Sequence, residues 1–196
     1  MNRSSQIFRK TNETEIAIDL NIDGVGKKLI DTPIGFLNHM LDLFSKQGLF
    51  DLNIKAKGDV SVDEHHTVED IGIVLGQTFL EALGDKKGIG RYGFFILPMD
   101  EALATAAIDF SGRYSFALDC NFTREKIGDL STELIYDFWS AFAQSAKVNL
   151  FIKVENGRND HHKIEAIFKA VARAIRMACE IDKRSPLEIP STKGVL

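Results

Sequence analysis

The sequence predicts an α/β (α+β) two-layer sandwich made of two copies of one unit, each with two helices packed on a mostly antiparallel sheet. Two observations predict this fold class. Stretches with apolar residues at every second position alternate with stretches of helical spacing. A shift of 98 residues also places 39–55 over 137–153, matching the apolar helix positions, the helix-to-strand break and an L-x-I-K strand. Such copies can bury their sheets under paired helices.

The elements follow one another in a regular order. An apolar face at every second position indicates a strand at 13–23, and helical spacing indicates a helix at 34–48 that Gly48 is expected to end. A strand at 49–59 and a helix at 65–84 complete the first copy. In the second copy, strands are expected at 92–100, 102–112, 114–120 and 148–157, and helices at 132–147 and 161–182.

The chain is predicted to be a single domain of 196 residues, with repeats at about 1–98 and 99–182 and a C-terminal tail at 183–196. No linker rich in Pro, Gly or Ser divides it. The net charge of −4 argues against a nucleic-acid partner, and no apolar run is long enough for a membrane span. No secretory signal is visible, and two cysteines form no disulfide framework, so a cytoplasmic protein is expected.

Four of the five histidines belong to two His-His-x-x-Glu motifs: His65, His66 and Glu69, and His161, His162 and Glu165. On a helix, the first histidine and the glutamate lie ~40° apart, whereas the second histidine is turned by ~100°. Two such helices can build two sites if each gives a His–Glu pair to one ion and its second histidine to the other. This ligand set suits Mn, Fe or Zn. Solvated helix-start histidines are the alternative, but identical spacing in both repeats favours metal binding.

The stretch GIGRYG at 88–93 fits the G-x-G-x-x-G dinucleotide motif. That motif requires a preceding strand and a following helix, whereas here a helix precedes and a strand follows. A nucleotide site is therefore not expected. Arg91, inside this turn, is of more interest as an anion ligand.

Five stretches together resemble imidazoleglycerol-phosphate dehydratase, the lyase of histidine biosynthesis: GFLNHMLDLFSKQGLFDL, DEHHTVEDIGIVLGQ, PMDEALATAAIDFSGR, NDHHKIEAIFKAVARA and PSTKGVL. The resemblance runs from about Arg9 to Leu196 and fits the single-function form without a fused phosphatase. It implies a duplicated α/β sandwich, two Mn(2+) ions per subunit, and active sites at the interfaces of a 24-subunit homo-oligomer.

The resemblance also implies roles for individual residues. Metal ligation falls to His39, His65, His66, Glu69, Asp137, His161, His162 and Glu165. Substrate binding falls to Glu13, Arg91, Arg113, Lys169, Ser191, Thr192 and Lys193, with Glu13 and Glu165 as the catalytic acids. Two positions depart from the family pattern: Asn38 stands where many members have Asp, and Asp137 where many have a metal-binding histidine and others Glu. The internal repeat independently pairs Asp137 with His39.

The expected reaction dehydrates D-erythro-imidazole-glycerol phosphate to imidazole-acetol phosphate. No carbonyl acidifies the proton to be lost, so two metal ions are expected to hold the imidazole and stabilise its anion, while carboxylates move protons and basic groups anchor the phosphate. Two alternatives stay open. A dinuclear metallohydrolase would release inorganic phosphate, and a non-catalytic metal-stapled assembly module would have no use for Arg91, Arg113 and PSTKG.

Overall fold

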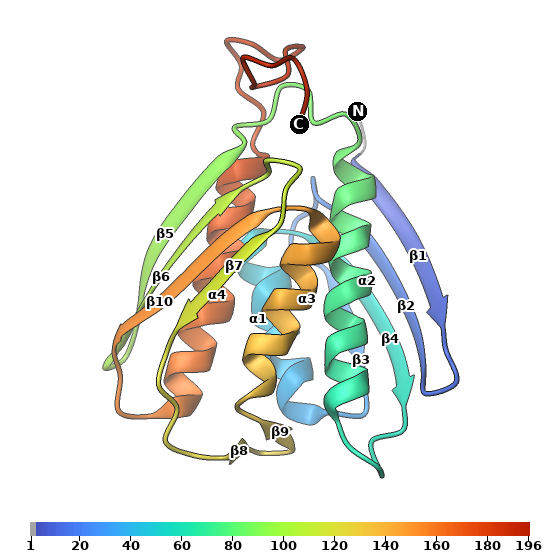
Figure 1. Ribbon diagram of the computed structural model, residues 1–196, viewed down its shortest axis with the longest axis vertical. Coiled ribbons are helices and arrows are strands. Elements are labelled where there is room, and N and C mark those ends of the chain that lie inside the picture. Colours follow the sequence, from blue (N-terminus) through green and yellow to red (C-terminus); the bar gives the residue numbers. More distant parts are fainter. Residues whose placement is uncertain (1–2) are drawn as a thin grey trace.

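Two four-stranded sheets form the outer layers of the computed structural model, which describes residues 3–196 (Figure 1). The first has the order β1-β2-β4-β3, with bounds Ser4–Lys10, Thr14–Asn21, Asp51–Gly58 and Lys28–Asp31. The second has the order β5-β6-β10-β7, with bounds Tyr92–Met99, Ala102–Asp109, Asn149–Asn156 and Ser115–Asp119. In both, the first three strands are antiparallel and the fourth runs parallel to its neighbour. The predicted duplication is confirmed by this shared topology.

Four helices lie between the sheets: α1 Gly35–Gly48, α2 His65–Leu83, α3 Leu134–Ala146 and α4 Asp160–Cys179. Helix α2 packs on β1, β2 and α3, while α4 packs on β5, β6 and α1. Each half is thus the predicted two-layer unit, and the halves meet helix against helix. Of the helices in residues 3–196, none is long and apolar enough to cross a bilayer.

Large aromatic side chains fill the contact between the two halves. The largest fully buried ones there are Phe44, Phe79, Phe138, Trp139, Phe142 and Phe168. Burying a side chain of this kind contributes roughly 2–3 kcal/mol. The aromatic core therefore packs the four helices against one another.

Helices α1 and α3 end at equivalent residues of the two copies. Leu49 and Lys147 both adopt the left-handed conformation, with φ of 57° and 54°. The expectation that α1 ends at Gly48 is confirmed, although the left-handed residue is Leu49, and a Cβ at Gly48 would lie 2.1 Å from the Phe50 ring. Helix α4, by contrast, ends at Cys179 rather than at the expected 182.

Four strands were not expected from the sequence: β1, β3, and the short pair β8 Lys126–Ile127 and β9 Leu130–Ser131. Strands β1 and β3 are the two edges of the first sheet. Edge position alone does not explain this, because the edge strands β5 and β7 of the second sheet were expected; β1 and β3 lack a sufficient run of alternating apolar residues. The stretch SSQIFRK carries only two apolar residues, and KLID is only four residues long.

Candidate active site

A compact group of three candidate metal ligands lies where α4 begins. Helix α1 packs against α4 and brings His39 to His161 and Glu165. The Glu165 carboxylate oxygen Oε2 lies 3.3 Å from His161 Nε2 and 3.8 Å from His39 Nε2. The three ligand atoms all lie within 4.8 Å of one another. His161 and Glu165 therefore share one face of α4, as the helical angle predicts.

The equivalent group on α2 is more open. His65 Nε2 lies 3.9 Å from Glu69 Oε2, and both side chains are almost half exposed. Helix α3, which packs on α2, places Asp137 at the repeat equivalent of His39. Within residues 3–196, no hydrogen bond or ion pair joins Asp137 to this pair. Metal ligation by Asp137 therefore stays a prediction.

The second histidine of each motif points away from the first. The ring planes of His65 and His66 are 89° apart, and those of His161 and His162 are 84° apart. His66 Nδ1 lies 3.2 Å from Asp59, and His162 Nδ1 lies 2.7 Å from Glu101. An imidazole that donates its Nδ1 proton to a carboxylate presents Nε2 as a metal ligand.

These hydrogen bonds also shift the pKa of one group in each histidine–carboxylate pair. The hydrogen bond to Asp59 raises the pKa of His66, and the hydrogen bond from His162 lowers the pKa of Glu101 to about 2. Neither acid is marked as a site residue by the sequence. They lie 7 and 61 residues from their histidines, so no local motif marks them.

The donor set suits a divalent ion such as Mn(II). Imidazole nitrogens and carboxylate oxygens are its usual protein ligands. Burial raises the pKa of Glu165, but Lys169, His39 and His161 lower it, and the net direction is downward. The buried carboxylate is thus kept in the ionised form that a metal requires.

Lys169 lies beside this group rather than with the other predicted phosphate ligands. Its Nζ bonds Glu165 one helical turn away and lies 3.3 Å from Met99 Sδ. Glu13, the other candidate acid, lies at the opposite histidine pair, with its carboxylate 3.8 Å from His66 Nδ1. Within one chain, the two predicted catalytic residues, Glu165 and Glu13, therefore lie at different histidine groups.

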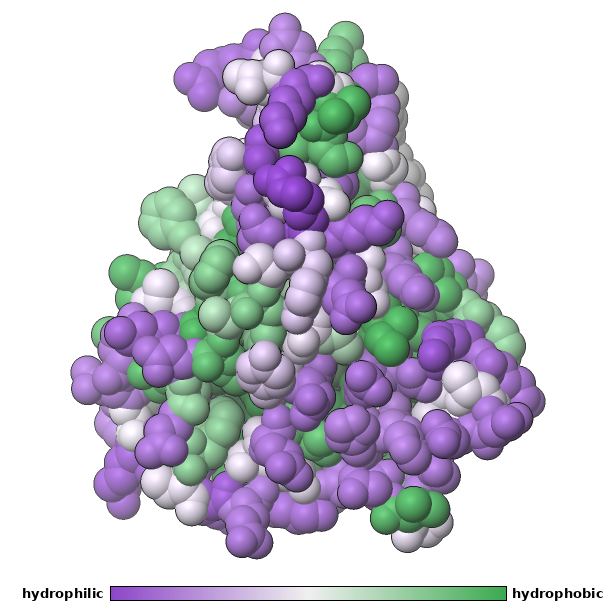
Figure 2. All heavy atoms as spheres, in the orientation of Figure 1, coloured by the Kyte–Doolittle hydropathy of each residue, from purple (hydrophilic) through white to green (hydrophobic). Residues whose placement is uncertain are grey.

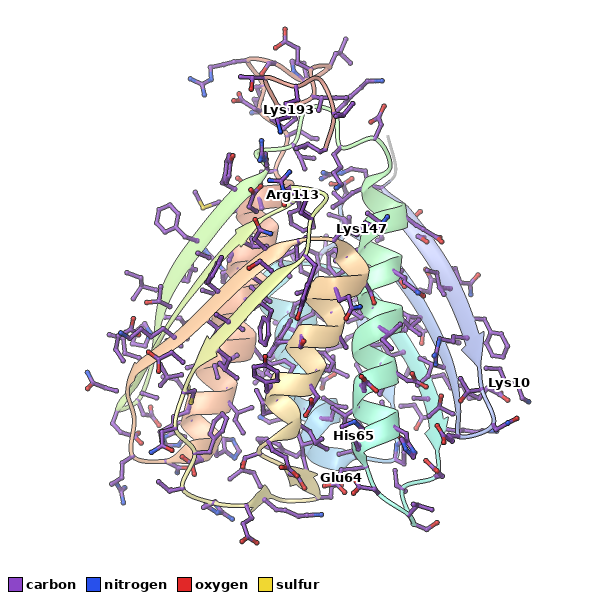
Figure 3. The ribbon with its side chains drawn as sticks, viewed as in Figure 1. Lys10, Glu64, His65, Arg113, Lys147 and Lys193 are labelled. Atoms are coloured by element: carbon purple, nitrogen blue, oxygen red, sulfur yellow. The ribbon has the colours of Figure 1, made fainter. Side chains whose placement is uncertain are left out.

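The remaining predicted phosphate ligands lie at the far end of the molecule, as the positions of Arg113, Lys193 and His65 show (Figure 3). Helix α2 separates the two ends and is about 28 Å long at 1.5 Å per residue. The Arg113 guanidinium donates to Ser111 O at 3.3 Å, and the Lys193 amide donates to Ser191 Oγ at 3.2 Å. The structure thus brings Ser191, Thr192 and Lys193 together in the tail, but separates them from the histidines.

Arg91 holds the tail in place. Its Nε and one terminal nitrogen donate to Asp109, at 2.7 and 3.2 Å, and the other terminal nitrogen donates to Pro190 O at 2.9 Å. The Arg91 guanidinium therefore ties the tail at Pro190 to Asp109, the last residue of strand β6. Its predicted contact with the substrate phosphate stays a prediction.

The chain is similar to known proteins of one family. The family model of imidazoleglycerol-phosphate dehydratase matches residues 32–175. The imidazoleglycerol-phosphate dehydratase of Clostridium novyi (strain NT) is 55% identical, covering 99% of this chain and 98% of its own. That of Koribacter versatilis (strain Ellin345) is 53% identical, covering 99% and 100%. The crystal structure of the Staphylococcus aureus subsp. aureus N315 enzyme matches with a TM-score of 0.83 at 41% identity, over 91% of this chain and 99% of that one.

The duplicated α/β fold and these relatives place the chain among the hydro-lyases, enzymes that eliminate water from a substrate. Within that class, the chain belongs to the imidazoleglycerol-phosphate dehydratase family, which acts in histidine biosynthesis. The family membership expected from the sequence motifs is confirmed.

Proposed function

We propose that the chain dehydrates D-erythro-imidazole-glycerol phosphate to imidazole-acetol phosphate in a site that holds two Mn(II) ions per subunit. The observation that carries the metal requirement is the convergence of His39, His161 and Glu165 at the start of α4. Two further histidines with carboxylates at Nδ1 support it, because an imidazole that donates its Nδ1 proton to a carboxylate offers the Nε2 lone pair to an ion.

The chain's own residues have separable roles in this proposal. Bound ions would supply Lewis acidity that stabilises negative charge on the imidazole. Glu165, kept ionised by its basic neighbours, and the half-exposed Glu13 are the groups that take and return protons. Arg113 and Lys193 anchor the phosphate, which holds the glycerol carbons against these acids.

The separation of the two ends supports an active site shared between subunits. A substrate made of one ring and a three-carbon phosphate chain cannot span the length of α2 from His65 to Arg113. The metal-binding end of one subunit must then meet the phosphate-binding tail of another. We therefore propose a homo-oligomer, with 24 subunits expected from the resemblance.

An apolar surface on the second sheet supports this self-association. Exposed side chains on β5 and β10 lie on its outer face: Tyr92, Phe94, Ile96 and Phe151. Figure 2 shows hydrophobic side chains gathered on this side of the molecule. A contiguous exposed apolar patch is typical of protein–protein contacts. The cytoplasmic location expected from the sequence remains a proposal.

The proposal is tested by assaying metal content and product together. Wild-type protein should bind about two Mn(II) ions per subunit and form a ketone without releasing inorganic phosphate. His161→Ala should lose one ion and activity. Arg113→Ala, the matched control, should keep both ions while its KM rises strongly.

Each alternative gives a different result. Release of inorganic phosphate would favour the metallohydrolase. A metal-stapled module would lose its oligomeric state on chelation and show no turnover when reloaded. Full activity in metal-free protein would rule out the metal requirement.

A further inference from the structure

Residues 121–132, which we call the strap, cross the end of the molecule at which the ligand-bearing helices begin (Figure 1). The strap contains the β8–β9 pair, whose Ile127 and Leu130 are buried. Thr132 closes it by donating its amide to Glu125 O at 2.8 Å and its hydroxyl to Arg124 O at 2.7 Å. The strap is thus a well-ordered unit with its own hydrogen bonds.

The strap is bonded to α4 through Asp160, the residue before His161. One Asp160 oxygen accepts from the Thr123 amide at 2.7 Å and from the Arg124 amide at 2.8 Å. The other accepts from Lys163 Nζ, which also donates to Asn121 O at 2.7 Å. Asp160 is 1% exposed, so these bonds form away from solvent.

The same arrangement recurs at α2. Glu64, the residue before His65, accepts from the Ser131 amide and from Lys126 Nζ, both at 3.0 Å. An acid that directly precedes each histidine pair therefore holds one end of the strap. Both copies of the duplication use the same device, although the strap itself occurs once in the described residues.

The strap also provides the cap that α1 lacks. Helix α1 has Ile34 at its N-cap and no acid in its first turn. Asp129 supplies both carboxylate oxygens instead, accepting from the Gly35 amide at 2.6 Å and the Phe36 amide at 2.9 Å. These are orphan N–H groups that every helix start must satisfy. His39 lies one turn further along α1.

We propose that the strap fixes the relative positions of the four ligand-bearing helices and thereby sets the affinity for the metal ions. Glu64, Asp129 and Asp160 are its positioning residues, and α3, which carries Asp137, begins two residues after the strap ends. A coordination group made of side chains from different helices keeps its geometry only if those helices keep their spacing. This inference rests on the proposed metal dependence.

The test is a chelator titration of the manganese-loaded protein, with bound Mn(II) followed by its electron paramagnetic resonance signal. Asp129→Ala should weaken Mn(II) binding by about tenfold, as loss of a group that orients ligands does. Asp129→Asn, which keeps an acceptor oxygen in place, should weaken it less. The matched control is Asp51→Ala, because Asp51 accepts from the Val25 and Lys27 amides, both at 2.9 Å, beyond the opposite end of α1.

The outcomes separate the strap from the metal site itself. Wild-type affinity in Asp129→Ala, or equal weakening in Asp51→Ala, would overturn the strap proposal. If Asp129→Ala fails to fold, an Asp129→Asn protein of wild-type affinity would overturn it equally. By contrast, a wild-type protein that binds no Mn(II), or a His161→Ala variant that binds it unchanged, would overturn the proposed function.

Discussion

Asp160 shows how one buried carboxylate links the stability of the protein to pH. Burial raises its pKa, but hydrogen bonds from Lys163, Arg124 and Thr123 lower it by more. The net pKa is about 2. Because folding lowers this pKa, the carboxylate stabilises the native state at pH values above its pKa in the unfolded chain, about 3.9. This stabilisation is lost as the pH falls from about 4 to about 2.

Asp160→Asn should therefore lower the free energy of unfolding at pH 7 by about 2 kcal/mol and weaken its dependence on pH between 4 and 2. Denaturant titrations at several pH values measure both effects. Asp85→Asn is the control, because this exposed acid pairs with Lys87 at the surface. A variant with the wild-type pH profile would contradict the assigned role of Asp160.

Individual contacts of the candidate site could be predicted from the sequence only where they are local. The helical angle predicted that His161 and Glu165 share a face, and the structure agrees. Asp59 and Glu101 could not be predicted, since the fold alone brings them to His66 and His162. Arg91 shows the same limit: its bonds to Asp109 and to the tail depend on sheet pairing and on a contact 99 residues away.

At the scale of elements, two glycines set the spacing between α2 and α3. A Cβ at Gly72 would lie 2.6 Å from Phe138 O, and one at Gly76 would lie 2.5 Å from Phe142 O. Both obstacles are backbone atoms, which cannot rotate away. The helices can pack this closely only because neither position carries a side chain.

Gly76→Ala should thus destabilise the protein by about 1–3 kcal/mol, because overpacking outweighs the higher helix propensity of alanine. Chemical denaturation measures the change. Glu81→Ala, at an exposed position of the same helix, should stay within about 0.5 kcal/mol of the wild type. A stabilised Gly76→Ala variant would show that α3 can move aside without loss.

Elements with a strong period were predictable, including the edge strands β5 and β7 of the second sheet, whereas the edge strands β1 and β3 of the first sheet and the strap were not. The helices at 35–48 and 65–83 bury continuous apolar faces, and their expected bounds differ from the observed ones by at most one residue. Strand β3 is four residues long and largely exposed, so its apolar pattern is too short to detect. The strap is held by Glu64, Asp129 and Asp160, whose contacts are 36 to 94 residues apart in sequence.

For the whole molecule, the duplication explains why the histidine groups share one end. Helices α2 and α4 occupy equivalent places in the two copies, so both begin at the same end of the molecule (Figure 1). The tail follows α4 and therefore lies at the other end, beside Arg113 (Figure 3). The repeat in the sequence predicted that the two histidine pairs have equivalent roles. Only the fold shows that the predicted phosphate ligands lie at the other end of the molecule.

This separation predicts complementation between two variants that are each impaired at substrate concentrations well below the KM of Arg113→Ala. His161→Ala lacks a metal ligand, and Arg113→Ala lacks a phosphate ligand at the opposite end. If each active site takes one end from each of two subunits, mixed oligomers contain sites in which both ends are intact. Equal co-expression should restore about a quarter of wild-type activity, the statistical share of such sites in a symmetric assembly.

The measurement is the activity of co-expressed and co-purified variants compared with each variant alone. Mixing His161→Ala with His39→Ala serves as the matched control, because both changes fall in the same histidine group and no combination repairs it. That control should stay inactive, while the opposite-end pair gains activity. If the opposite-end pair also stays inactive although both chains are found in one particle, the two ends must meet within a single subunit, and the tail would have to leave the position in which Arg91 holds it.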